Sequence, residues 1–425
     1  MPKYINDSRL GQNFKRNFTM KQDRVKLADF GISSVRGFLP NEDPLTVLPP
    51  TLDFLDDFGK NLPELIESKE ILTKAQLLPI PPLEYLALLR PRELELVWMR
   101  YVFIQSAFVH SQTPNIKPIF ICPSLARPVW AISRILNKPP ILSYDAYTLN
   151  NWKRINKTGP IKVDNLELIQ TFIRDSDQAW FILIHVDIEY EAGFGIRSLW
   201  DANLCIEYGM GGLLDHFLVK VSQSIKNMIA TMKRMPEGTS PDTYHRIRPW
   251  IMPFKDVVYQ GVDELGWKPQ SFRGQTGAQT SIFQSLEPGL QIPKLSDDSL
   301  AIHLMDMRNY MPLRHRQFIE YLENNSKVRD FVISSAPHLI DIYDECVLNI
   351  LTFLAIHLGY AFFYIHQKTT NPKGTGDTPD FMDYLGKRIG ERWEKAFIKQ
   401  RSDDDFKLFM NNVRKMVKEL IAGDL

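Results

Sequence analysis

The chain has 425 residues, and its 51 lysine and arginine residues nearly balance its 50 aspartate and glutamate residues. This balance provides no electrostatic basis for binding nucleic acid or an anionic membrane, so we expect neither as a partner. The length exceeds one ordinary core, and 44% hydrophobic and 11% aromatic residues are typical of a globular protein that can enclose a ligand. Cys122, Cys205 and Cys346 lack CxxC spacing, which excludes a zinc ribbon or a disulfide framework.

The first part of the chain predicts a mobile basic arm over residues 1–30, followed by a small N-terminal helical domain over 31–172. The arm has no apolar core of the secretory type, so we expect a cytoplasmic protein. Proline clusters separate the helical stretches of the small domain, and five prolines within 117–146 favour short helices and extended joints.

The remaining residues, 173–425, predict a large helical domain. Residues 175–178, DSDQ, are good N-cap residues, so the apolar run 179–193 is predicted to be a helix rather than a buried strand. A proline-initiated helix pair is expected over 307–335, and an amphipathic helix over 381–398 is expected to close the chain. Strand signals are sparse, and the predicted fold class is mainly α.

The most informative stretch is the apolar segment Pro337–Lys368, which carries His357 deep inside it. A helix with no polar face must be enclosed by protein or lipid. A membrane span is disfavoured because Asn349 and His357 would sit in hydrocarbon and the chain has no second such segment. The imidazole needs a partner, so His357 is either a hydrogen-bonded core histidine or an axial ligand to haem iron.

Eight short motifs occur in a fixed order along the chain: RGFLP (Arg36–Pro40), LPELIES (Leu62–Ser68), PPILSYDAYTLNNW (Pro139–Trp152), TGAQTSIFQ (Thr276–Gln284), MRNYMPLRHRQF (Met307–Phe318), NNSKVRDFV (Asn324–Val332), YDECV with IHL downstream (Tyr343–Leu358) and GTGDT (Gly374–Thr378). Over roughly residues 30–395, this ordered set resembles the indoleamine 2,3-dioxygenase family.

The resemblance implies a two-domain helical haem protein in which the larger domain holds haem b. His357, on the helix that follows Tyr343–Asp344, matches the family's proximal iron ligand. The implied reaction inserts dioxygen across the indole C2–C3 bond of tryptophan or another indole and gives an N-formylkynurenine-type product. We expect a monomer or a weak homo-oligomer.

The resemblance also indicates residues that contact substrate. Arg248 matches the arginine that pairs with the substrate carboxylate, for which a guanidinium offers a two-pronged donor, and Arg246 is the competing candidate. Tyr144 and Tyr147 match positions that line the pocket, although both could be ordinary core aromatics.

Further matches fall on the stretch GQTGAQ, which in the family passes over the distal face of the haem. Gly274 and Gln275 are expected to contact the cofactor, together with Phe181, and Thr276 is expected near the substrate.

GTGDT resembles the family's glycine–threonine loop, which closes over substrate, and Thr378 is the predicted contact; a plain linker is the alternative. Asp377 replaces a glycine of that pattern, which stiffens the loop and adds a negative charge near the pocket mouth.

Two departures from the family affect the chemistry. Leu354 stands where members can carry an arginine, and Glu287 where they can carry its acidic partner, so we expect that ion pair to be absent. His185 stands where a small residue is usual, and Glu189, four residues on, could orient its ring.

His185 also defines an alternative function. If it faces the iron as a distal acid or base, the protein could be a haem-dependent monooxygenase or peroxygenase that tailors an indole or a tryptophan-derived substrate. If the ring points into the core, the plain dioxygenase interpretation holds. A haem-binding sensor or carrier without turnover is the non-enzymatic alternative, and the substrate arginine and the glycine loop argue against it.

Overall fold

The computed structural model describes residues 25–112, 117–294, 299–368, 374–377 and 381–423. The described chain is mainly α, as predicted. The helices of its first part are α2 (Asp53–Glu67), α3 (Ile71–Gln76), α4 (Leu83–Leu86), α5 (Pro91–His110) and α6 (Pro123–Leu136). Those of its second part are α7 (Ser176–Glu207), α8 (Leu214–Lys233), α9 (Met235–Gly238), α10 (Pro241–Ile247), α11 (Ser281–Gly289), α12 (Ser299–Arg308), α13 (Leu313–Asn325), α14 (Val328–Ser335), α15 (Ile340–Tyr364), α16 (Phe381–Lys395) and α17 (Asp403–Ala422).

Short elements connect these helices. The strands are β1 (Ile119–Ile121), β2 (Lys153–Arg154), β3 (Leu166–Glu167), β4 (Phe254–Tyr259) and β5 (Gln270–Phe272). The single turns are η1 (Leu27–Phe30), η2 (Pro50–Leu52), η4 (Val163–Asn165), η5 (Gly211–Leu213), η6 (Arg248–Ile251), η7 (Asp263–Leu265), η8 (Gly277–Gln279), η9 (Pro337–Leu339), η10 (His366–Lys368) and the π-helical turn η3 (Asp145–Leu149). Strand β4 pairs in parallel with β1 and antiparallel with β5, so a small sheet joins two distant parts of the chain.

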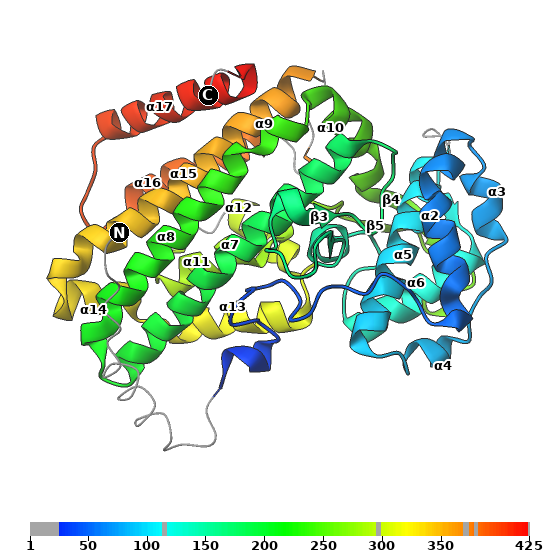
Figure 1. The fold of residues 1–425 in the computed structure, drawn as a ribbon, viewed down its shortest axis with the longest axis horizontal. Coiled ribbons are helices and arrows are strands. Elements are labelled where there is room, and N and C mark those ends of the chain that lie inside the picture. Colours follow the sequence, from blue (N-terminus) through cyan, green and yellow to red (C-terminus); the bar gives the residue numbers. More distant parts are fainter. Residues whose placement is uncertain (1–24, 113–116, 295–298, 369–373, 378–380, 424–425) are drawn as a thin grey trace.

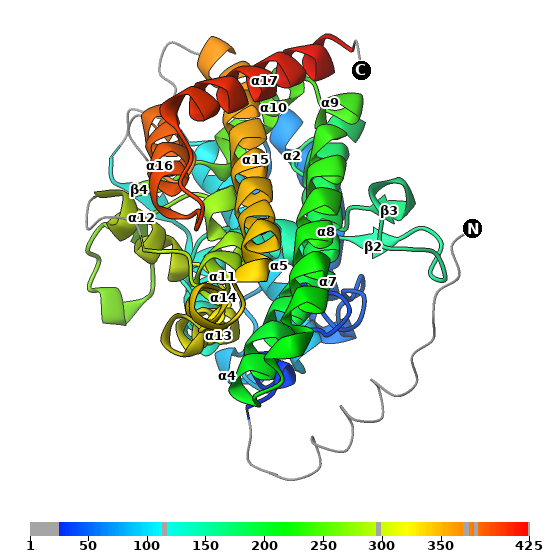
Figure 2. The same cartoon turned by 90° about the vertical axis from the view of Figure 1, so that its left-hand side faces the viewer.

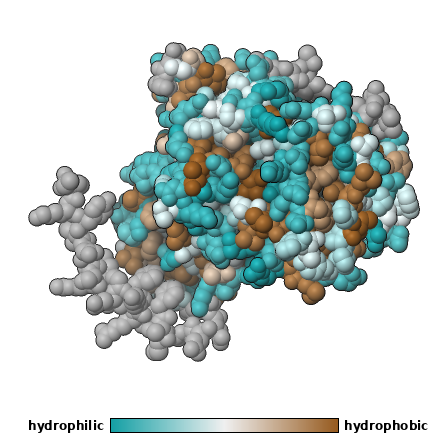
Figure 3. Space-filling model, turned by 45° about the vertical axis from the view of Figure 1, so that its right-hand side comes forward, coloured by the Kyte–Doolittle hydropathy of each residue, from teal (hydrophilic) through white to brown (hydrophobic). Residues whose placement is uncertain are grey.

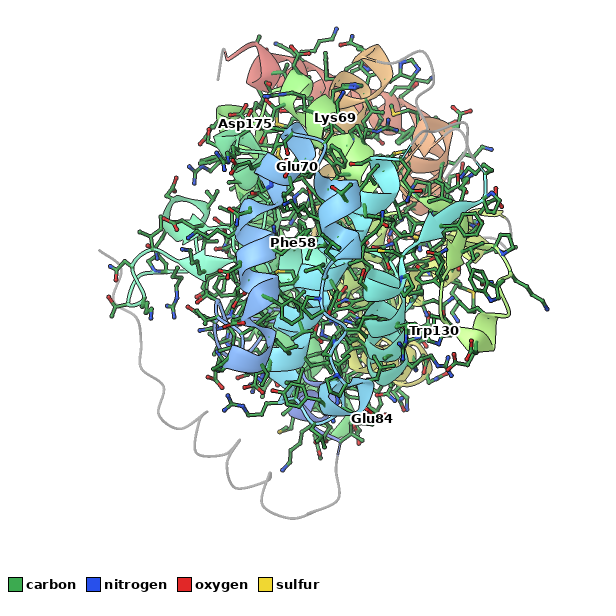
Figure 4. The ribbon with its side chains drawn as sticks, turned by 90° about the vertical axis from the view of Figure 1, so that its right-hand side faces the viewer. Phe58, Lys69, Glu70, Glu84, Trp130 and Asp175 are labelled. Atoms are coloured by element: carbon green, nitrogen blue, oxygen red, sulfur yellow. The ribbon has the colours of Figure 1, made fainter. Side chains whose placement is uncertain are left out.

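Buried side chains form two main clusters. One lies among α2, α3, α5, α6 and the small sheet, at the right of Figure 1, and Figure 4 shows its outer side with Phe58 of α2 and Trp130 of α6 labelled. The other lies among α7, α8, α11 and α15. Trp152 packs in the second cluster and Ile182 in the first, so the segments on each side of residue 172 contribute to both cores. The predicted division at that residue stays a prediction.

The predicted N-terminal arm is too long by several residues. Residues 1–24 lie outside the described chain, but Leu27 and Phe30 of η1 are buried. The ring of Phe30 packs at 5.4 Å from Phe318 and 6.1 Å from Trp200, measured between ring centroids. The packed structure therefore begins before residue 31, where the small domain was predicted to start, because two apolar side chains of the predicted arm lie in the core.

Three long helices, α7, α8 and α15, run side by side, with α8 in contact with both of the others (Figure 2). Helix α7 begins as predicted, since the carboxylate of Asp175 accepts a hydrogen bond from the Asp177 N–H at 2.9 Å. Within the described chain, the segment Pro337–Tyr364 alone is long and apolar enough to cross a membrane, and 61% of its most apolar stretch is buried. Such burial is typical of a core helix.

The C-terminal helix was not anticipated. We expected the helix over residues 381–398 to close the chain, but α16 ends at Lys395 and α17 follows it. Ser402 caps α17 by accepting from the Asp405 N–H, and Phe409 stacks at 5.2 Å from Trp393 of α16. On the surface seen in Figure 3, hydrophobic and hydrophilic residues are interspersed.

Candidate active site

A large pocket lies between α7, α15, α16 and the loop before α11. It contains about 1520 Å³ of space, open solvent at its mouth included. Its walls bring together residues that are far apart in the sequence, among them Phe181 and His185 of α7, His357 of α15 and Arg388 of α16. Most other wall residues are aliphatic or aromatic, so a ligand here is surrounded mainly by apolar surface.

His357 projects into this pocket from the apolar helix α15. Neither imidazole nitrogen forms a hydrogen bond within the described part of the chain. Burial lowers the pKa of His357 to about 4, with further lowering from the charges of His185 and Arg388. The ring is therefore neutral at physiological pH and can offer a nitrogen lone pair to a metal.

His185 reaches the same pocket from α7. Its Nδ1 lies 2.7 Å from the carbonyl oxygen of Phe181, one turn earlier. Since a carbonyl only accepts, Nδ1 carries the proton and Nε2 of the neutral ring is an acceptor. Burial lowers the pKa of His185, which favours this neutral form.

Glu189 does not orient His185 as predicted. The hydroxyl of Thr280 donates to Glu189 Oε1 at 2.6 Å, and Oε2 has no partner within the described chain. Burial raises the pKa of Glu189 to about 7, although Thr280 and Tyr144 partly oppose the shift. The carboxyl is thus hydrogen-bonded to Thr280 and lies near Tyr144, two residues of the pocket wall.

Aromatic rings cover the wall beside His185. Phe181, predicted to contact the cofactor, lies on the wall with its centroid 5.0 Å from the His185 ring, and Tyr144 lies at 6.3 Å. Tyr147, predicted to line the pocket, is outside its wall. It is buried in the first cluster, 5.8 Å from Phe103, because the π-helical turn that follows Tyr144 directs the two tyrosines to different cores.

Arg248 begins η6 and is half-buried beside Tyr244, a pocket residue whose pKa is raised by burial and lowered in part by the Arg248 charge. Arg248 itself is not among the residues of the pocket wall. Arg246 points elsewhere and forms an ion pair with Asp175 at the start of α7. Of the two arginines, Arg248 is the nearer to the pocket, one residue behind its wall.

The stretch from Gly274 to Thr276 crosses the pocket. Gln275 and Thr276 are on the wall, whereas Gly274, also predicted to contact the cofactor, is not. A Cβ on Gly274 would meet the carbonyl oxygens of Ile251 and Thr375 at 2.4 Å, so only glycine allows these three backbone segments to meet. This close approach positions the wall against the glycine–threonine loop.

Within that loop the structure describes residues 374–377; Thr378 lies outside the described residues. Gly374, Thr375 and Gly376 line the pocket. The Asp377 carboxylate pairs with Lys255 at 2.6 Å, and Arg273 donates to the Asp377 carbonyl at 3.1 Å. The added negative charge is therefore neutralised, so it does not oppose an anionic substrate as the sequence suggested.

The ion pair expected to be absent is present in another form. Glu287 of α11 accepts from Arg388 at 2.9 Å and also from Arg392, both on α16. Burial alone would raise the pKa of Glu287, but the two guanidinium groups lower it to about 2. Leu354 supplies apolar wall, and the positive charge comes from a helix about 30 residues later in the chain.

The profile of one protein family, described as indoleamine 2,3-dioxygenase, matches residues 26–405. The chain belongs to the indoleamine 2,3-dioxygenase family. It is 29% identical to indoleamine 2,3-dioxygenase 1 of Rattus norvegicus over 88% of this chain and 96% of that protein. It is 28% identical to 6-hydroxytryptophan 2,3-dioxygenase of Fusarium equiseti over 80% of this chain and 85% of that protein. Members of this family are haem-dependent oxygenases that act on indoles or tryptophan, and this chain is one of them.

The pocket fits a haem group. It provides a neutral imidazole that has no hydrogen-bond partner among the described residues, aromatic and aliphatic walls for a flat macrocycle, and a buried guanidinium at one edge.

Sequence reasoning missed that guanidinium, Arg388, and also His303 and Tyr244, which line the same pocket. The one available signal was the spacing of Arg388 and Arg392, which places two arginines on one face of an otherwise amphipathic helix.

Proposed function

We propose that this indoleamine 2,3-dioxygenase family member cleaves the indole C2–C3 bond of tryptophan or a closely related indole and releases an N-formylkynurenine-type product. We further propose that its cofactor is haem b and that His357 would supply the nitrogen ligand to its iron. The observation that carries the proposal is the bare, neutral imidazole of His357 on an apolar pocket wall. When bound, the haem supplies the activation of dioxygen.

The remaining roles belong to the residues of this chain. Apolar and aromatic side chains, Phe181 and Tyr144 among them, exclude water and hold the flat indole ring. Arg248, one residue behind the wall beside Tyr244, is proposed to bind the substrate carboxylate, with Thr276 close to the amino acid backbone. Gly374, Thr375 and Gly376 of the glycine–threonine loop line the same pocket.

His185 is proposed to accept a hydrogen bond from the indole N–H. Its Nδ1–H donates to the Phe181 carbonyl, so the neutral ring presents only the Nε2 lone pair to the pocket. The monooxygenase or peroxygenase alternative needs the opposite property, because its distal histidine must donate a proton to bound oxygen. This geometry therefore favours ring cleavage over the alternative.

One of the relatives suggests a second candidate substrate. The Fusarium equiseti relative is named for 6-hydroxytryptophan, so a substituted tryptophan is a proposed substrate beside tryptophan itself. A cytoplasmic location, a monomeric or weakly oligomeric state, and the lack of nucleic-acid and membrane partners remain predictions from the sequence.

The test compares four compounds with the purified, reduced holo-protein: L-tryptophan, 6-hydroxytryptophan, tryptamine and 1-methyl-L-tryptophan. We expect a Soret band, formylkynurenine-type products from the two amino acids with an N–H, and a higher KM for tryptamine, which lacks the carboxylate. Arg248→Ala should raise KM for L-tryptophan at least tenfold and change KM for tryptamine little, while the matched Arg246→Ala changes neither. A protein without a Soret band, or one whose indole products keep the C2–C3 bond, contradicts the proposal.

A further inference from the structure

Three charged side chains form a buried cluster behind one edge of the pocket. Glu287, Arg388 and Arg392 are 7%, 6% and 5% exposed. Each oxygen of the Glu287 carboxylate accepts from one of the two guanidinium groups, and Arg392 also donates to the carbonyl oxygen of Pro293. Two positive charges thus share one negative charge, and the cluster carries a net charge of about +1 inside the protein.

A buried charge without a counterion is costly, so this excess is expected to meet an anion. Arg388 is the member of the cluster that faces the pocket. Its Nη2 is used by Glu287, whereas its Nε has no hydrogen-bond partner within the described part of the chain. Arg388 therefore adds positive charge to a wall that is otherwise mostly apolar and keeps one buried donor without a partner in the described chain.

We propose that Arg388 is a carboxylate-binding residue of this pocket. A guanidinium donates through two parallel N–H groups, which match the two oxygens of a carboxylate. The Glu287 carboxylate holds the side chain in place, and Arg392 keeps the net charge positive. An acidic residue fixed between two guanidinium groups orients Arg388 without neutralising the site.

Two carboxylates can reach such a pocket, and this part of the inference rests on the proposed function. One is a propionate of the haem, and the other is the carboxylate of an amino acid substrate, which Arg388 would then share with Arg248. Leu354 of α15 lines the same pocket and carries no charge, so Arg388 of α16 supplies the positive charge there.

The first arm of the test determines whether Arg388 binds a haem propionate. Wild type and Arg388→Gln are loaded with haem or with haem dimethyl ester, whose propionates are blocked, and loss of the group to excess haem-free globin is followed by absorbance. If a propionate is the partner, wild type loses haem about tenfold more slowly than the ester, and Arg388→Gln removes that difference. Lys395→Gln, on the exposed side of α16, is the matched control and behaves as wild type.

The second arm determines whether Arg388 binds the substrate carboxylate. Binding of L-tryptophan and of tryptamine to the holo-proteins is measured from the shift of the Soret band, without turnover. If the substrate carboxylate is the partner, Arg388→Gln weakens L-tryptophan binding about tenfold and leaves tryptamine unchanged. Arg388→Lys, which keeps the charge and loses the two-pronged geometry, should recover part of either effect and protects the test against misfolding of the Gln variant.

Either result supports a carboxylate site at Arg388. Thermal unfolding curves show whether both variants fold. The inference is overturned if both fold and bind haem, haem dimethyl ester, L-tryptophan and tryptamine as wild type does. A wild-type protein that binds no haem contradicts the proposed function, while the tryptophan and tryptamine arm, then read by calorimetry, still decides the role of Arg388.

Discussion

The two sides of the pocket each contain a histidine and a buried glutamate, yet the electrostatics of the two sides are opposite. On the α7 side, Glu189 accepts from the hydroxyl of Thr280, and burial raises its pKa to about 7. On the α16 side, Glu287 meets two guanidinium groups, which overcome burial and lower its pKa to about 2. Burial of a carboxyl therefore does not by itself determine its charge; the sign of the neighbouring charge does.

The histidines differ in a parallel way. His185 uses Nδ1 on a backbone carbonyl of its own helix, whereas the nitrogens of His357 find no such partner in the described chain. His185 therefore presents one lone pair to the pocket, whereas neither nitrogen of His357 is engaged within the described chain, which leaves its lone pair available to iron. Four substitutions test how far this contrast extends.

The largest effect is expected at His357. His357→Ala should remove nearly all bound haem, because the pocket then offers no lone pair on that wall, and added imidazole should restore part of the Soret band. His185→Ala is the matched variant from the opposite wall and should keep its haem. Equal haem content in the two variants would falsify the assignment of different roles to the two rings.

Glu287→Gln should destabilise the protein strongly, by about 3 kcal/mol at pH 7, because two buried guanidinium groups lose their counterion. The folded pKa of about 2 lies below the ordinary 4.5, so the carboxylate contributes stability that is fully present above pH 4.5 and is lost as the pH falls toward 2. Denaturant unfolding at pH 7 and pH 3 measures this, and the gap between variant and wild type should narrow at pH 3. Glu345→Gln, which breaks a half-exposed pair with Lys226, is the control and should cost less than about 1 kcal/mol.

Glu189→Gln should show the opposite pH dependence. The folded pKa of about 7 lies above the ordinary 4.5, so the folded protein holds its proton more tightly and wild-type stability falls as the pH rises through this interval. We expect wild type to lose about 2 kcal/mol between pH 5 and pH 7 relative to Glu189→Gln. Parallel curves for the two proteins over that range would show that Glu189 is ionised like an ordinary carboxylate.

The smallest expected effect is at Thr280. Thr280→Val removes the hydroxyl that donates to Glu189 and also the oxygen that caps α11 through the Ile282 N–H, and should cost about 1 kcal/mol. In the Glu189→Gln background the cost should change, since the two residues share one hydrogen bond. A double-mutant cycle by denaturant unfolding measures this coupling. Additive effects of the two substitutions would contradict it.

Much of the fold could be predicted because its signals are local. The Asp175 cap and the apolar run behind it determine α7, and the continuous apolar sequence around His357 determines a buried helix. Side-chain capping and helical periodicity act within one or two turns, so they can be read from neighbouring residues. The helix α17 escaped prediction although it has an equally local cap at Ser402.

The pairings that define the site depended on tertiary structure. Sequence alone determined that His357 lacks a local partner, but only packing brought Arg388 to Glu287, about 100 residues away, and Thr280 to Glu189. Likewise, the spacing placed Glu189 on the same helical face as His185. In the structure, however, His185 donates to the Phe181 carbonyl, and Glu189 accepts from Thr280, which caps α11. Such choices follow from the distances between helices, which a linear pattern does not contain.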